Sequence, residues 1–198
     1  MSVSDDIASH NVQWTNCIEL MLARWCDQAK CFEWMHNESY TYYNTRARIL
    51  MISSNLLTAV GGLSNVITGS YDINGFQLSW IFGSISIFVS LTSLLQDKLG
   101  YATSTTEHKQ YMMLWGIIRR KIEEELLLPA QSRKNCGTFL KCIRQDINQV
   151  SIDGNSKIPA HLRRACYVKY CDIPNFDIPD ICGQIEHTQI YMESTPLL

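Results

Sequence analysis

The strongest constraint on how this chain can fold is a long apolar stretch, residues 49–96, in which Asp72 is the only charged side chain. Asp72 divides the stretch into two runs, 49–71 and 73–96, and each exceeds the roughly 20 residues that a helix needs to cross a bilayer. Because lipid offers no hydrogen-bond partners to the backbone, each run predicts a helix. The polar residues between the runs, with a turn near 70–76, predict a transmembrane hairpin. Two buried helices of a soluble bundle are the alternative, which the lack of charge disfavours.

The basic residues near the stretch indicate its orientation. Arg46 and Arg48 precede the first run and Lys98 follows the second, whereas the turn contains no lysine or arginine. Positive charge favours the cytosolic side, so both termini are expected there. The first residues lack the basic region and early apolar core of a signal peptide, and the first membrane helix is therefore expected to provide targeting.

Length and charge exclude some partners. The chain has 198 residues and a net charge of −2, with 17 basic and 19 acidic residues. This is the size of one domain, and the balance gives no indication of nucleic-acid binding. The expected partners are instead a lipid bilayer and other proteins, a second copy of the chain included.

The flanks of the hairpin predict further helices, so the fold class expected is all-α. Residues 1–13 are expected to be a flexible N-terminus, and residues 14–48 an amphipathic helix that continues into the first apolar run without a glycine or proline to stop it. Residues 99–150 predict a polar link at 103–106, a helix that ends before Pro129, and a shorter helix at 138–150. The apolar stripes on both sides of the hairpin are expected to pack antiparallel as a cytosolic stem.

Residues 151–198 predict a docking tail. Pro159 is typical of the first turn of a helix, and a repeated Asp-Ile-Pro unit then favours extended or turning backbone. Such a segment can dock on the folded chain or on a partner. The residues expected to carry the docking are Ile158, Pro159, Ile173, Pro174, Phe176, Ile178 and Pro179.

Small residues recur on one face of each predicted membrane helix. At this spacing they allow two helix backbones to approach closely, and hydroxyl groups across such a contact contribute roughly 0.6 to 2 kcal/mol each. A packing surface is favoured over a pore lining, because neither run contains an ionisable group that would mark an ion path. The expected packing residues are Gly61, Gly62, Ser79, Gly83, Ser86, Ser90 and Ser93.

No motif indicates an enzyme, a cofactor or a metal site. The chain lacks a phosphate-binding glycine loop, a nucleophile elbow and a histidine pair at metal spacing on a helix. Its cysteines lack the paired spacing of zinc knuckles, and a catalytic role for Cys17 or Cys31 would need an activating environment that sequence does not show. A reducing compartment would keep all eight as thiols: Cys17, Cys26, Cys31, Cys136, Cys142, Cys166, Cys171 and Cys182.

Two histidines occupy related positions. His36 and His108 lie on the apolar stripes of the two stem helices, one on each side of the hairpin. They could meet across the stem and form a joint that titrates near neutral pH. The alternative is that each is a hydrogen-bonded interface histidine without a switching role.

These features together resemble the SLATT superfamily of proteins with two transmembrane helices. The resemblance covers about residues 30–128 and rests on His36, the pair Tyr43-Asn44, the pair Gly61-Gly62, a second span, and then His108 with Tyr111. Residues 147–159, with their Ser-Lys-Ile-Pro motif, are similar to the extension of copies carried by large double-stranded DNA viruses.

The resemblance implies two functions. Bacterial members are proposed pore-forming effectors gated by nucleotide-sensing partners, whereas the viral copies look like membrane components of the particle or its precursor. The 198 residues show no sensor domain, so the structural role is the one expected. The function expected is therefore that of a non-enzymatic integral membrane protein that links the internal bilayer of a virion to its capsid shell, with an oligomeric pore as the alternative.

Overall fold

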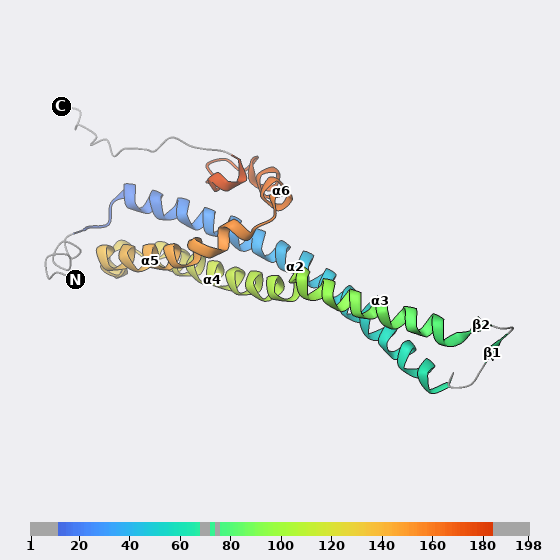
Figure 1. Ribbon diagram of the computed structural model, residues 1–198. Coiled ribbons are helices and arrows are strands. Elements are labelled where there is room, and N and C mark those ends of the chain that lie inside the picture. The colour runs from blue at the N-terminus through green and yellow to red at the C-terminus, as the bar shows by residue number, and fades with distance from the viewer. Residues whose placement is uncertain (1–11, 68–71, 74–75, 184–198) are drawn as a thin grey trace, which may run out of the picture. The chain divides into compact units, whose positions relative to one another are not determined.

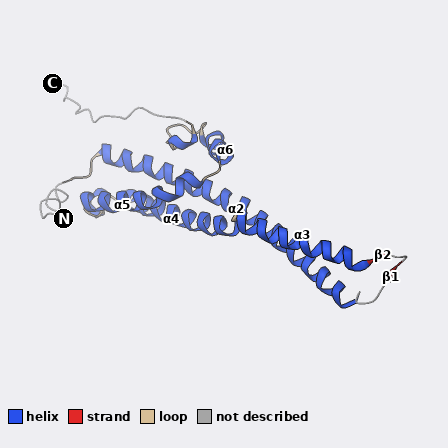
Figure 2. Cartoon of the chain, viewed as in Figure 1, coloured by secondary structure: helices blue, strands red, loops and turns tan. Residues whose placement is uncertain are grey.

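The protein is all-α, as its sequence predicts, apart from one pair of two-residue strands (Figure 2). The computed structural model describes residues 12–67, 72–73 and 76–183, without the side chains of 63–82 and 96. The elements are α2 Asn16–Ile67, β1 Asp72–Ile73, β2 Phe76–Gln77, α3 Leu78–Leu99, α4 Tyr101–Leu127, η1 Ala130–Ser132, α5 Cys136–Gly154, η2 Asn155–Lys157, α6 Ala160–Tyr170 and η3 Asp180–Cys182.

The chain divides into two compact units. Residues 1–39 and 108–198 form one, called here the folded unit, and residues 40–107 form the other, called the hairpin unit. Helix α2 is a single helix that contributes to both units, as the absence of glycine and proline before the first apolar run predicts. Three predicted features lie outside the described residues: most of the flexible N-terminus, most of the turn near 70–76, and the tail from residue 184.

In the folded unit, the first part of α2 packs antiparallel to α4, as predicted for the two apolar stripes: His36 pairs with His108, whereas the earlier Cys26 pairs with the later Arg119 (Figure 1). Phe32 stacks on Trp115 with ring centroids 4.6 Å apart, and Glu33 accepts a 2.7 Å hydrogen bond from Arg119 one turn further along α4. The residues fully buried between the helices recur at helical spacing, but on α2 the buried face is centred on Leu22 and Cys26, one position beyond the predicted Met21 and Trp25, which are half-buried. The fully buried residues include Leu22, Ala29, Met35, Ile118 and Ile122.

Helix α5 covers the same core. It begins after Asn135, whose side chain accepts a hydrogen bond from the backbone N–H of Thr138 and so caps the first turn. Phe139 and Ile143 are buried, with exposed fractions of 6% and 0%. The helix extends beyond the predicted 138–150 at both ends, because this cap lies before Cys136 and no proline follows until Pro159.

The tail after α5 completes this core. Ile158 and Ile178 are 1% and 8% exposed and belong to the same cluster as the stem residues, and Pro179 is buried as well. Phe176 is half-buried, with its ring stacked on Tyr170 at 4.9 Å. These side chains therefore dock on the folded chain itself, which is one of the two alternatives that the sequence leaves open.

The remaining predicted docking residues differ from these. Pro159 is half-buried before α6, whereas Ile173 and Pro174 are exposed. On α6, Val168 is 65% exposed, whereas Cys166 is buried. Of the predicted docking residues, Ile173 and Pro174 thus remain exposed for another protein.

The hairpin unit contains the second part of α2, the paired strands, α3 and the start of α4. The strands pair antiparallel with Asp72 opposite Gln77 and Ile73 opposite Phe76. Gly100, with a φ of +58°, separates α3 from α4 in the left-handed conformation that glycine adopts without strain.

The polar link predicted at 103–106 is wrong, because these residues are helical and belong to α4. The hydroxyls of Thr105 and Thr106 donate to the carbonyl oxygens of Tyr101 and Ala102. Threonine is accommodated inside a helix when its hydroxyl bonds to the preceding turn in this way.

Candidate functional site

The hairpin unit exposes an unusual amount of apolar surface. On the described parts of its helices, large apolar side chains that a soluble protein would bury are about half or more exposed. No charged residue interrupts the sequence between Ile49 and the end of α2. The exposed side chains are Ile49, Met51, Ile52, Leu56, Val60, Ile87, Phe88, Leu91, Leu94, Leu95 and Leu99.

Hydroxyl groups on these helices bond to their own backbone. The side chains of Ser53 and Thr58 donate to the carbonyl oxygens four residues earlier on α2 at 2.8 Å, and Thr92 does the same on α3. Such bonds satisfy the hydroxyls without water. The helices thus present a surface whose polar groups are few and are internally paired at these positions.

Among the helices that the structure describes, none is both long enough and apolar enough to cross a membrane.

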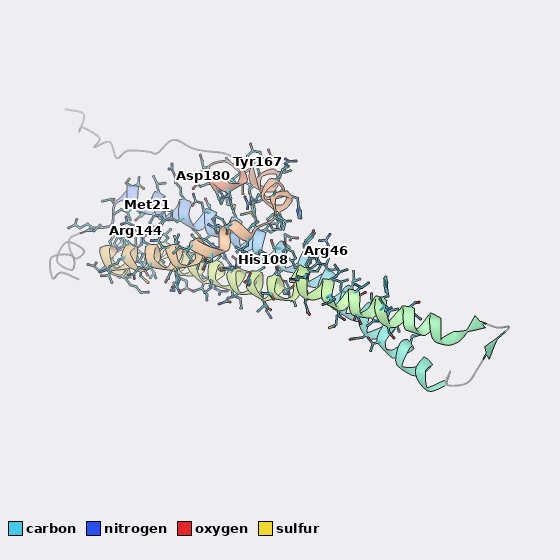
Figure 3. The ribbon with its side chains drawn as sticks, in the orientation of Figure 1. Met21, Arg46, His108, Arg144, Tyr167 and Asp180 are labelled. Carbon is cyan, nitrogen blue, oxygen red and sulfur yellow. The ribbon has the colours of Figure 1, made fainter. Side chains whose placement is uncertain are left out.

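Aromatic and basic side chains lie together near the start of the hairpin unit. The guanidinium of Arg46, which is labelled in Figure 3, lies 3.5 Å from the centroid of the Tyr42 ring, and this ring packs edge-to-face with Tyr43. Tyr43 also contacts Tyr101 at the start of α4, with ring centroids 6.0 Å apart. Tyrosines and snorkelling cations are typical of the boundary between lipid and water.

The residues predicted to pack the two spans are only partly brought together. Gly61 is buried, and a Cβ at this position would lie 3.8 Å from Ile85 on α3. No side chain that the structure describes lies within 4 Å of a Cβ at Gly62 or Gly83, and the side chain of Ser79 is not among those described. The remaining predicted packing residues, Ser86, Ser90 and Ser93 on α3, are exposed. Packing of the two helices through these serines therefore stays a prediction.

The predicted stem joint is formed in the folded unit. His36 on α2 and His108 on α4 are 0% and 2% exposed, and their Nδ1 atoms are 2.9 Å apart. One ring must donate and the other accept, so the hydrogen bond requires at least one neutral imidazole. The ring of Tyr111 lies 5.3 Å from that of His36 and covers it further.

Burial lowers the pKa of the His36 side chain well below that of a histidine in water. Loss of hydration on burial, together with repulsion from a charged His108, lowers the pKa of His36 from 6.5 to about 3. The predicted titration near neutral pH therefore does not apply to the folded histidine. Nε2 of His36 is also buried without a hydrogen-bond partner among the described residues, an arrangement that costs roughly 1 to 3 kcal/mol.

No family model matches this chain, and no match is found among curated proteins or solved structures.

The cysteines form no disulfide among the described residues, and the structure describes no group of three or more side chains that would hold a metal ion. Cys17, Cys142 and Cys171 are exposed and the other five are buried. Burial raises the pKa of the Cys26 thiol to about 11, which disfavours the reactive thiolate.

Three of the buried thiols meet near Met35. Hydrogen bonding to Cys182 lowers the pKa of the Cys166 thiol, but hydrogen bonding to Cys31 and burial outweigh that effect and raise it to about 12. Cys182 contacts the sulfur of Met35 at 3.8 Å. These cysteines join α2 to the tail as small apolar side chains.

Sequence reasoning missed one buried charge. Glu125 on α4 is 3% exposed and accepts a hydrogen bond from the backbone N–H of Lys134, so it holds the loop between α4 and α5. The signal was present, because Glu125 continues the spacing of Trp115, Ile118 and Ile122 on the buried face.

Proposed function

We propose that the hairpin unit inserts into a lipid bilayer and anchors the folded unit at the membrane. The observation that carries the proposal is the exposed apolar surface of the hairpin helices. Burial of apolar surface is worth roughly 25 cal/mol per Å², so leaving these side chains in water is costly, whereas lipid surrounds them without that cost.

The sequence supports the proposal beyond the described side chains. The apolar runs 49–71 and 73–96 are longer than the parts whose side chains the structure describes, and the proposal rests on their full length. The tyrosines next to Arg46 suit the headgroup region. With basic residues only outside the hairpin, both termini would lie in the cytosol.

The resemblance to the SLATT superfamily supports a more specific role. In that role the chain is a non-enzymatic component of the internal membrane of a large DNA virus, and the folded unit links this membrane to the capsid shell. The exposed part of the folded unit, rather than the buried tail residues, would make the contact. Recovery of the chain with the membrane fraction of purified particles would support this role, and its absence from particles would contradict it.

Insertion is tested by placing charge on the exposed apolar face. Lysine at the centre of a membrane helix costs roughly 2.5 to 3.5 kcal/mol, so Leu56→Lys combined with Leu91→Lys should release the protein from membranes under carbonate extraction. Leu127→Lys is the matched control, because Leu127 is 84% exposed at the end of α4, outside the apolar runs. Extraction of the unchanged chain by carbonate would refute the anchor.

Topology is tested with a membrane-impermeant maleimide. A cysteine introduced by Asn74→Cys should react only from the lumenal side, whereas the exposed Cys142 should react only from the cytosolic side. Labelling of both from one side would contradict the hairpin. A reproducible single-channel current from the intact chain in planar bilayers would instead favour the oligomeric pore.

A further inference from the structure

The folded unit contains a cavity that none of the features above explains. Its volume is about 320 Å³, and it lies among α2, α4, α5, η2 and η3. Three aromatic side chains line it, together with polar residues from the later elements. The lining residues that bear on its chemistry are Trp25, Phe32, Trp115, Arg144, Asn155 and Asp180.

Two polar atoms of the lining residues are buried without a partner. Trp115 is 2% exposed, and its indole Nε1 has no hydrogen-bond acceptor among the described residues. Oδ1 of Asn155 is also buried, and no hydrogen-bond donor among the described residues reaches it. Each such group costs roughly 1 to 3 kcal/mol when it is left unsatisfied. A donor and an acceptor thus both lack partners in the lining of a single cavity.

The surroundings of these atoms are flat and apolar. Phe32 stacks on Trp115 with an interplanar angle of 18°, and Trp25 supplies a further ring. The charged lining residues, Arg144 and Asp180, are exposed and of opposite sign, and Figure 3 labels them on α5 and η3. The lining therefore carries no net charge, which suits an uncharged occupant.

We propose that this cavity binds a small, planar, uncharged molecule whose edge carries a hydrogen-bond acceptor beside a donor, as an aromatic amide or a heterocyclic lactam does. The acceptor would take the Trp115 indole N–H and the donor would bind the Asn155 carbonyl oxygen. The flat body would lie against the aromatic walls, as is usual in ligand sites with a few polar groups. This inference is independent of the membrane anchor, because every lining residue belongs to the folded unit.

Water alone is a poor occupant of this space. A buried water makes about three hydrogen bonds and takes up about 30 Å³, so one molecule would leave most of the cavity unfilled. Further waters would find partners at the polar lining residues but not against the three aromatic rings. The size and the walls thus favour an organic ligand, and the two outcomes are separable by experiment.

The probe is benzamide, which combines an aromatic ring with an amide edge. Full-length protein in detergent, labelled with ¹⁵N at its five tryptophans, is titrated while the indole N–H signals are recorded by NMR. The Trp115 signal, assigned from Trp115→Phe, should shift saturably in the low-millimolar range expected of a ligand with about nine non-hydrogen atoms. The Trp34 signal is the internal control, because Trp34 lies outside this lining.

Chemical and protein controls separate binding from partition into detergent. N,N-dimethylbenzamide lacks the donor for Asn155 and should bind about tenfold more weakly, the loss expected for one hydrogen bond to a buried group. Trp115→Phe should weaken benzamide binding by a similar factor, measured through saturation transfer to the ligand. Ser151→Phe, which places a ring at a half-buried lining position on α5, should abolish it.

Three results would overturn the proposal. The first is the absence of a saturable shift at Trp115, which would leave the cavity to water. The second is an equal shift at Trp34, which would indicate partition into the detergent. The third is unchanged binding in Ser151→Phe while its spectrum remains that of the folded protein.

Discussion

Replacing His36 by glutamine should remove part of the acid sensitivity of the folded unit. The histidine is fully buried, and its pKa is lowered from 6.5 to about 3 by burial and by His108. An unfolded chain therefore binds a proton at this side chain below pH 6.5, whereas the folded protein does not until about pH 3. Because the folded pKa is depressed, this contribution to stability is complete above pH 6.5 and is lost as the pH falls towards 3.

The magnitude follows from proton linkage. Between pH 7.5 and pH 5.0 the unfolded histidine becomes almost fully protonated while folded His36 stays neutral, which lowers the free energy of unfolding by about 2 kcal/mol. Glutamine does not titrate, so the variant should lack this part of the loss. The groups facing His36 are the same in both measurements: His108, the ring of Tyr111, and the Lys157 ammonium 5.9 Å from that ring.

The assay is guanidinium unfolding of the full chain in detergent at the two pH values. Tryptophan fluorescence reports mainly on the folded unit, which contains Trp14, Trp25, Trp34 and Trp115. His161→Gln, at an exposed position on α6, is the matched control and should lose as much stability on acidification as the unchanged protein. An equal loss in His36→Gln would refute the reasoning, as would an NMR titration that places the pKa of His36 near 6.5.

Two further predictions concern packing and thiol reactivity. Gly154→Ala should destabilise the folded unit by roughly 1 to 3 kcal/mol in the same assay, because the added Cβ would lie 2.9 Å from a ring carbon of Tyr111. Gly116→Ala should cost less, since the Cβ there would meet the far end of the Glu33 side chain, which can shift together with Arg119, rather than a ring, and an equal cost would contradict this account. Among the cysteines of the folded chain, maleimide should modify only the exposed Cys17, Cys142 and Cys171, as measured by mass spectrometry. Early modification of a buried cysteine would show that the core opens.

The local structure of most elements was predictable from sequence because it depends on near neighbours. The unbroken α2, the end of α4 before Pro129 and the inward face of α5 follow from helical spacing, caps and prolines. The break at Gly100 was misplaced to 103–106, since threonines that bond to their own helix have the same composition as a polar link. Composition alone does not distinguish these two uses of threonine.

The sequence by itself determined the all-α class and the contact between the two stem helices. Each flanking helix has one apolar face, and a hairpin between them places these two faces against each other. Tertiary structure alone decided that Ile178 closes the core instead of meeting a partner, and that the cavity brings Trp115 near Asn155. These contacts join residues far apart in the chain. Their register depends on how the loops close and how side-chain volumes fit, and periodicity carries no information about either.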